Sequence, residues 1–339
     1  MIWLLWRQHR KQALFALLGL AALAAFVIPT GMQMHGAFER AGLDDCLRAA
    51  ARVEFIDVNP EQPADPVRAC QELAAQFANR YGSLGSAGIL LWFLPLLAGL
   101  FWGAPLVARD VEHGTHRLVW TQGVSRLRWA VVKFGLVGAG VLLLTACYAL
   151  LVTWWRTPLD LATGDRFLSP GGSFDLVGLV PVGYALFAVA LGVFAGVLTR
   201  KTMPAMAITL VGFMAARLLV QLLARPRFVA PLRRTFPVLG DMAPNELTGD
   251  WLLRAGVYDA TGSRLRGGVF GNFSVAVCGA PPTTVNQCVT EFGQGAYNLQ
   301  LFHPADRYWL FQGIETALFV ALAALLLLAA VHWVRRRIS

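Results

Sequence analysis

Long apolar runs separated by short polar segments dominate the pattern of this chain. Six of these runs carry almost no charge and reach the roughly 20 residues that a helix needs to cross the hydrocarbon core of a bilayer. They cover 13–33, 84–108, 134–154, 176–198, 204–224 and 309–334. The pattern predicts an all-α polytopic membrane protein with six transmembrane helices.

Composition supports this prediction over a pair of soluble domains. Apolar residues make up 56% of the 339 residues and charged residues only 14%, whereas about a quarter of a soluble domain is charged. The first apolar run starts too near the N-terminus to leave a separate basic region, and it lacks a small-residue cleavage site. We therefore expect a retained span rather than a signal peptide.

The distribution of charge predicts the orientation of the spans. The segments 1–12, 109–133, 199–203 and 335–339 together carry thirteen Lys/Arg and two acids. The alternate segments 34–83, 155–175 and 225–308 carry fifteen Lys/Arg and seventeen acids. Because short cytoplasmic loops are enriched in Lys and Arg, both termini are expected in the cytoplasm.

The net charge of +9 does not indicate nucleic-acid binding. The basic residues are scattered at the edges of the spans, as at Arg7, Arg10, Arg200 and Arg335. That pattern sets topology and favours contact with anionic membrane lipids.

Cysteine positions agree with this orientation. Cys46 and Cys70 lie in the first outer segment, and Cys278 and Cys288 in the last. The outer side of a cytoplasmic membrane is the oxidising side, where disulfides persist. Four cysteines allow three pairings, of which the local one, Cys46–Cys70 with Cys278–Cys288, is the simplest. Cys147 falls within a span and is expected to be an inert apolar side chain.

The predicted spans divide the chain into five parts. These are an N-terminus with the first span (1–33), an extracellular helical cap (34–83), spans two to five (84–224), an extracellular domain (225–308), and the sixth span with a basic tail (309–339).

Local patterns predict elements within the two extracellular parts. Within 34–83, residues 66–81 have helical spacing. Within 225–308, the basic run with Pro226, Pro231 and Pro237 predicts an irregular crossing. Residues 256–265 alternate and turn at Thr261–Gly262, which predicts a β-hairpin, and 273–278 is a candidate further strand.

The segment 109–133 is the one long polar connection on the cytoplasmic side. Its only acids are Asp110 and Glu112, and residues 110–122 form a candidate short polar helix held between two spans. A projecting element of this kind is what a soluble partner could grip and move. A solvated loop with no partner is the alternative.

This segment contains an E-x-G-T motif followed by an apolar pair, then Ser-Arg and a later lysine. The motif residues are Glu112, Gly114, Thr115, Leu118, Val119, Ser125, Arg126 and Lys133. The motif closely resembles the loop after the second span in type-2 ABC export permeases. The stretches 94–122, 183–210 and 305–316 are similar to an actinobacterial branch of that family.

The resemblance implies a function. It implies a permease that pairs with a second copy or homologue in a bacterial plasma membrane and is driven by separate ABC-type ATPase subunits. The coupling residues would be Glu112, Gly114, Thr115, Leu118 and Thr121. The chain has no GxxxxGK[ST] phosphate-binding loop. ATP and Mg²⁺ are therefore expected in the partner ATPase, and this chain is expected to bind no cofactor.

Two polar residues interrupt the predicted spans at similar depth. Arg217 lies in the fifth span and Glu315 in the sixth. An isolated charge at the centre of a span would cost about 2.5–3.5 kcal/mol, so we expect an Arg217–Glu315 pair. The pair would pin two helices together or line an outer gate.

Other readings of the chain predict different features. A metal site at His113 and His116 would need further ligands, so we expect no metal and polar loop residues instead. A lipid-modifying enzyme would need an acid, base or metal group that the pattern does not show. A non-transporting membrane sensor or assembly factor, which binds a ligand through its extracellular parts, stays open as the alternative to an exporter permease.

Overall fold

The computed structural model of the chain describes residues 2–57, 66–114, 125–164, 173–239, 242–269 and 290–337. Within these residues, six helices are long and apolar enough to cross a membrane, as the sequence predicts. They cover His9–Arg40, Leu90–Glu112, Arg126–Thr163, Val180–Thr199, Thr202–Arg227 and Ala305–Arg336.

Four spans consist of one long helix each, preceded in the sixth span by the short turn η7 (Ala305–Arg307), and two are composite. The single helices are α1 (Ile2–Arg40), α7 (Arg126–Thr163), α8 (Val180–Thr199) and α11 (Tyr308–Arg337). The second span runs through η1 (Gly88–Phe93), α4 (Leu94–Ala98), η2 (Gly99–Gly103) and α5 (Ala104–Glu112). The fifth runs through α9 (Thr202–Leu219), η4 (Val220–Ala224) and η5 (Arg225–Arg227).

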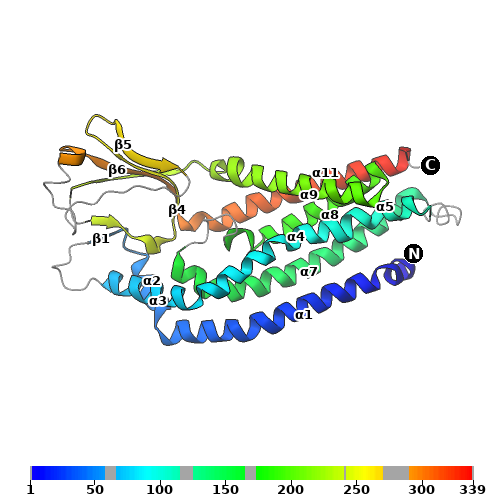
Figure 1. Cartoon of the computed structure of the whole chain (residues 1–339), viewed down its shortest axis with the longest axis horizontal. Helices are drawn as coiled ribbons and strands as arrows, with labels where there is room; N and C mark the ends of the chain where they lie inside the picture. Colours follow the sequence, from blue (N-terminus) through cyan, green and yellow to red (C-terminus); the bar gives the residue numbers. More distant parts are fainter. Residues whose placement is uncertain are drawn as a thin grey trace.

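Both termini lie at the same end of the helix bundle as the C-terminal end of α5 and the N-terminal end of α7 (Figure 1). The β-strands gather at the opposite end. We call these the terminal end and the sheet end. A chain with an even number of spans ends on the side of the membrane on which it begins, so both termini share one end.

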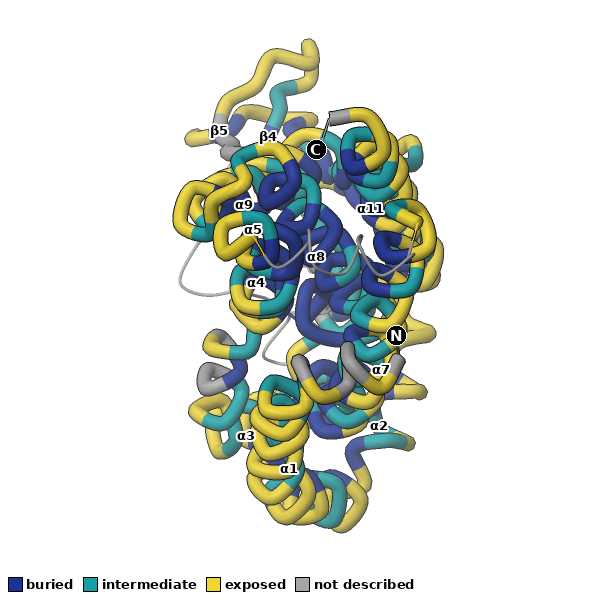
Figure 2. The backbone as a smooth tube through the Cα atoms, turned by 90° about the vertical axis from the view of Figure 1, so that its right-hand side faces the viewer, coloured by how far each residue is buried: buried dark blue, intermediate teal, exposed yellow. Residues whose placement is uncertain are grey.

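Helix α8 is the centre of the bundle, with α5, α7, α9 and α11 around it (Figure 2). Glycines let it approach the second span closely. A β-carbon at Gly192 would lie 2.5 Å from the backbone nitrogen of Ala104, and one at Gly103 would lie 2.5 Å from the carbonyl oxygen of Val189. Glycine on both helices therefore makes the second and fourth spans one tightly packed unit.

Helix α1 has a much smaller packed face than α8. It lies along α7, where the Trp155 indole donates a 3.0 Å hydrogen bond to the Thr30 hydroxyl and His35 stacks on Trp154. Large apolar side chains such as Phe15 and Met32 are exposed on its other faces. Such a surface suits the hydrocarbon of a bilayer.

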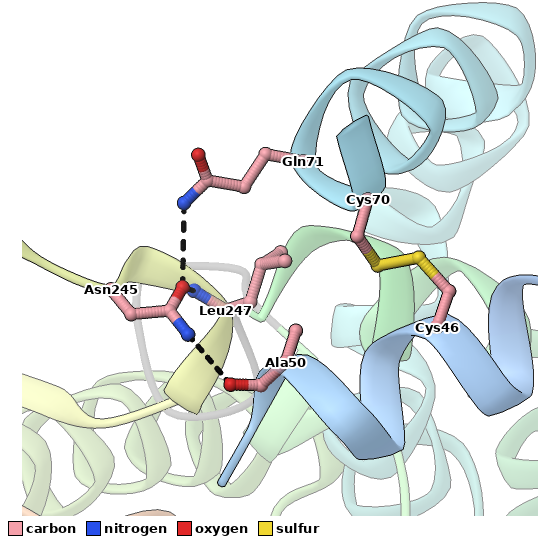
Figure 3. Close-up of a disulfide and its surroundings, with 6 residues drawn as sticks. All are labelled: Cys46, Ala50, Cys70, Gln71, Asn245 and Leu247. Atoms are coloured by element: carbon pink, nitrogen blue, oxygen red, sulfur yellow. Dashed lines mark hydrogen bonds between the residues drawn. A yellow bond between two sulfur atoms is a disulfide. The ribbon is translucent and has the colours of Figure 1, made fainter. Parts of the chain in front are cut away.

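A helical cap stands at the sheet end. It consists of α2 (Leu43–Ala50) and α3 (Pro66–Ala87), and the predicted Cys46–Cys70 disulfide joins them (Figure 3). The predicted helix at 66–81 is thus confirmed and extends to Ala87.

Four of the described strands form one sheet, which is larger than the sequence predicts. The antiparallel order is β2–β6–β4–β5, with β2 (Leu232–Pro237), β6 (Tyr297–His303), β4 (Trp251–Tyr258) and β5 (Arg264–Val269). The predicted hairpin is β4–β5. The prediction of an irregular crossing for the proline-rich run is wrong in part, because β2 forms there beside β6 and takes Pro237 at its last position on the sheet edge. The candidate strand 273–278 and the Cys278–Cys288 pair lie outside the described residues.

Asn245 connects the cap to the sheet region (Figure 3). Its amide donates 2.9 Å hydrogen bonds to the carbonyls of Ala50 and Val53, and its oxygen accepts from Gln71. A two-stranded ladder of β1 (Phe55–Asp57) with β3 (Met242–Pro244) lies next to it. The two extracellular parts of the prediction therefore form one joined body.

Candidate functional site

The connection between α5 and α7 is described at both of its ends. Residues 109–114 and 125–133 are described, while Thr115, Leu118 and Thr121, three of the five predicted coupling residues, lie outside the described residues. Glu112 and Gly114 lie at the C-terminal end of α5. The geometry therefore shows how the loop is anchored.

A buried ion pair closes the base of this loop. The Lys133 ammonium of α7 donates a hydrogen bond to the Asp110 carboxylate of α5. Lys133 is almost completely buried and also lies 5.1 Å from the centre of the Trp129 ring. Ser125 caps α7 by accepting a hydrogen bond from the backbone nitrogen of Arg128. Both stems of the loop are thus fixed to each other.

Glu112 is bonded to a third span. Its carboxylate accepts a 2.8 Å hydrogen bond from the Thr202 hydroxyl and a 3.1 Å bond from the Thr202 backbone nitrogen. Thr202 is the first residue of α9, so the carboxylate also stabilises the positive end of that helix dipole. Glu112 therefore links the loop to the fifth span. The sequence analysis did not predict this link.

Gly114 ends α5 in a left-handed conformation, with φ of +71°. A β-carbon there would meet no atom of the described residues within 4 Å. Conformation rather than space is therefore what favours glycine at this position.

A buried charge cluster lies at the sheet end of the spans. The cluster comprises Asp175, Tyr184, Arg217, Arg225 and Glu315, all buried. It contains two arginines and two acids, so its formal charge is zero. We refer to these five residues as the charge cluster.

The predicted direct Arg217–Glu315 pair is not what the structure shows, because each residue has a different partner in the charge cluster. Glu315 accepts two hydrogen bonds from Arg225, of 2.7 Å at Nε and 2.8 Å at Nη2. Arg217 instead lies 3.3 Å from Asp175, between Nη2 and Oδ2. Arg225 also donates a 2.6 Å hydrogen bond to Asp175. It thereby joins the Arg225–Glu315 pair to the Arg217–Asp175 pair.

Arg217 is also held by Trp92 of the second span. Its guanidinium carbon lies 3.6 Å from the centre of the Trp92 ring, and Nη1 donates a 2.9 Å hydrogen bond to the Trp92 carbonyl. A cation over a desolvated tryptophan face is a favourable arrangement. The fifth span is therefore fixed to the second at this depth.

Asp175 lies outside the spans in the short η3 turn (Ser173–Asp175). It pairs with both arginines of the charge cluster. Burial raises the pKa of this carboxyl, but Arg225 and Arg217 outweigh burial and hold the pKa below its ordinary value. The carboxylate is therefore charged at neutral pH, as two neighbouring arginines require.

Side chains of α8 and α11 complete the cluster. The Tyr184 hydroxyl donates to Glu315, and Gln312, one turn away, accepts 3.0 Å bonds from the backbone nitrogens of Leu179 and Val180 at the start of α8. The cluster thus joins the second, fourth, fifth and sixth spans at one depth. The arrangement positions helices, and its acids are neutralised by arginines rather than free for acid–base chemistry.

Sequence reasoning missed Asp175 and Arg225 because both lie at predicted loop boundaries. The available signal was their position, since each immediately precedes or follows an apolar run. A charge at such a boundary can fold back into the bundle when a partner of opposite sign lies there.

Comparison with known proteins gives one match. A family model described as "ABC-2 membrane transporter related" matches residues 17–225. The match covers more than half of the chain and includes most of the first span, spans two to five and the α5–α7 connection. No curated protein and no solved structure matches the chain.

Proposed function

The chain belongs to the ABC-2 membrane transporter related family, and from this premise we propose that it is the permease subunit of an ATP-driven exporter coupled to a separate ATPase through residues 109–133. The observation that carries the proposal is the anchoring of this loop to three spans. Asp110–Lys133 joins α5 to α7, and Glu112–Thr202 joins α5 to α9.

The anchoring suits transmission of force. A partner that pushes on the loop would move the ends of the second, third and fifth spans together, because each contact is local to the loop base. The second span packs against α8 through glycines, so the movement would also reach the centre of the bundle. Glu112 would meet the ATPase surface, Gly114 and Thr115 would set the loop geometry, and Leu118 would anchor the loop, with Thr121 as a further coupling residue.

The partner supplies the nucleotide chemistry in this proposal. ABC-type ATPase subunits would bind ATP and Mg²⁺ at the cytoplasmic face, and this chain would bind no cofactor. The membrane would be the plasma membrane of a bacterium, in line with the resemblance to an actinobacterial branch of export permeases. The charge distribution supports an orientation with the terminal end inside. A second permease copy or homologue would complete the pathway.

The charge cluster fits the outer gate of such a pathway. It lies at the sheet end. Ion pairs join the fifth span to the sixth and to Asp175, and hydrogen bonds of Trp92 and Tyr184 add the second and fourth spans. Opening the pathway would require these spans to separate at that depth. The cluster would then set the energy of the closed state.

Co-purification tests the proposed function. The tagged chain is extracted from its native membranes in mild detergent, and the proteins that travel with it are identified. Leu118→Asp in the loop is compared with Thr261→Asp in the β4–β5 turn at the opposite end. We expect a stoichiometric P-loop ATPase with the unmodified chain and with Thr261→Asp, but not with Leu118→Asp. Purification of all three without an ATPase would favour a membrane sensor.

A further inference from the structure

An apolar cavity of about 180 Å³ lies between four spans, and on α8 and α11 its lining residues lie near the middle of the helix. Helices α5, α7, α8 and α11 line it, with Leu106, Phe134, Gly138, Val193, Val320 and Ala324 among the lining residues. Every lining residue is apolar or glycine. The proposed coupling and gating contacts do not use this space.

The missing side chain of Gly138 creates part of the cavity. A β-carbon built at Gly138 would meet no atom within 4 Å, although the residue lies on the side of α7 that faces α8 and α11. Gly135, one turn earlier on the same helix, is exposed, also has open space at its β-carbon, and does not line the cavity. The same substitution at Gly138 and at Gly135 therefore adds bulk inside the cavity in one case and outside it in the other.

The cavity opens between α7 and α11. Val320 and Ala324 of α11 are exposed members of its lining, and Gly138 of α7 is half-buried. Leu325 and Leu328, which follow on α11, expose more than half of their surface. The mouth therefore lies on the surface that the bilayer covers.

On α7 and α11, the cavity begins about the thickness of one leaflet away from the terminal end. Phe134 lies eight residues into α7, about 12 Å along the axis, and Leu327 lies ten residues before the end of α11, about 15 Å. Half of a hydrocarbon core is also about 15 Å. At the terminal end of the same two helices, Arg128 and Arg335 are exposed and can meet a phosphate.

We propose that this cavity binds one acyl chain of an anionic phospholipid from the leaflet at the terminal end of the spans. The lining side chains offer water no hydrogen-bond partner, and apolar cavities of this size stay dry and bind apolar molecules. Inside a bilayer the apolar molecules at high concentration are acyl chains. The lipid would be a resident that fills the space between α7 and α11, separate from any exported substrate.

Photolabelling in nanodiscs tests the site. The full chain is embedded in phosphatidylglycerol with a trace of phosphatidylglycerol that carries a diazirine in the middle of one acyl chain, and labelled peptides are identified after irradiation. Gly138→Leu fills the cavity from α7, and Ala324→Phe fills it from α11. Gly135→Leu adds the same bulk as Gly138→Leu outside the cavity. Labelling of α1 at its exposed Phe15 serves as the internal standard.

We expect the peptides containing Gly138 and residues 320–324 to be labelled several-fold above α1 in the unmodified chain and in Gly135→Leu. Each cavity-filling variant should lose most of this excess while α1 labelling stays unchanged. A phosphatidylcholine probe should label the site less than the anionic probe. Even labelling of all spans, the same excess in both filling variants, or equal labelling by the two probes would overturn the proposal. The assay involves no ATPase, so its outcome is independent of the proposed coupling.

Discussion

The Glu112 carboxylate accepts hydrogen bonds from both the hydroxyl and the backbone nitrogen of Thr202, 90 residues further along the chain. This contact joins the last turn of α5 to the first turn of α9. It makes the polar loop at the terminal end part of a three-span unit, because Asp110 and Lys133 join α5 to α7 beside it.

The Glu112–Thr202 contact should appear as a thermodynamic coupling. Glu112→Ala and Thr202→Val each remove the same hydroxyl–carboxylate bond, so the double variant should lower the melting temperature by less than the sum of the single changes. His113→Ala, at the exposed neighbouring position, should add independently to Thr202→Val. Thermal unfolding of the purified chain in detergent measures this. Strict additivity of Glu112→Ala with Thr202→Val would show that the contact does not form.

Removal of one partner of the buried Asp110–Lys133 pair should be costly. Lys133→Met leaves the Asp110 carboxylate buried without its cation, and breaking a buried pair in this way typically costs about 3–5 kcal/mol. The further change Asp110→Asn should recover part of that loss. The unfolding free energies of the single and double variants measure the effect. Arg128→Gln, an exposed change on the same helix, should have little effect, and an equal loss there would contradict the assignment.

When one arginine of the charge cluster is removed, the loss of stability should be recovered best by neutralising the acid that pairs with it in the structure. Arg225→Met should be strongly destabilising, and adding Glu315→Gln should recover part of the loss because these two residues share two hydrogen bonds. Adding Glu315→Gln to Arg217→Met should recover much less, since Arg217 pairs with Asp175. Melting temperatures of the four variants decide this. If Glu315→Gln rescued Arg217→Met better than Arg225→Met, the result would support the direct Arg217–Glu315 pair that the sequence suggests.

Prediction from the sequence succeeded where short-range patterns decide the structure. Six apolar runs gave the spans, and the Thr261–Gly262 turn gave the β4–β5 hairpin, because length and turn chemistry are local properties. The strand β2 was missed because its partner β6 lies more than 60 residues away and its basic, proline-containing sequence lacks clear alternation. Pairing over such distances is set by packing that the sequence pattern does not display.

The candidate site shows the same division. The anomaly of Arg217 and Glu315 was visible, because charges within apolar runs need partners. Their partners Asp175 and Arg225 were not predicted, since both belong to connections that fold back into the bundle. Similarly, the E-x-G-T motif identified Glu112 but not its bond to Thr202, because nothing in the local sequence connects positions 90 residues apart.

The cysteines test both the cap and its orientation. The Cys46–Cys70 disulfide closes a loop of 24 residues, and loss of such a crosslink should cost about 3 kcal/mol. Cys46→Ser should therefore lower the melting temperature of the oxidised chain but not that of the reduced chain. In intact cells, a membrane-impermeant maleimide should label Cys46 and Cys70 only after reduction. Labelling without reduction would contradict the disulfide, and protection after reduction would contradict an outward sheet end.

Stability should fall in mild acid because of His303 in the sheet. Burial lowers the pKa of His303 below 6.5, and a hydrogen bond to the Pro226 carbonyl offsets this only in part. The unfolded chain therefore binds the proton more readily, so the stabilisation is complete above the unfolded pKa and is lost as the pH falls through the folded pKa. Melting temperatures from about pH 7.5 to about pH 5 should decline, with a smaller slope in His303→Gln. An unchanged slope would exclude His303 as the cause.

Site-directed crosslinking tests whether the α5–α7 connection contacts a P-loop ATPase in the membrane. A photoreactive amino acid is placed at Thr121 in the α5–α7 connection and, as a control, at Ser263 in the β4–β5 turn, and cells are irradiated before lysis. We expect that Thr121 alone crosslinks to a P-loop ATPase, and that Leu118→Asp in the same chain abolishes the product. Absence of an ATPase adduct at Thr121, or an equal yield at Ser263, would contradict coupling through this loop.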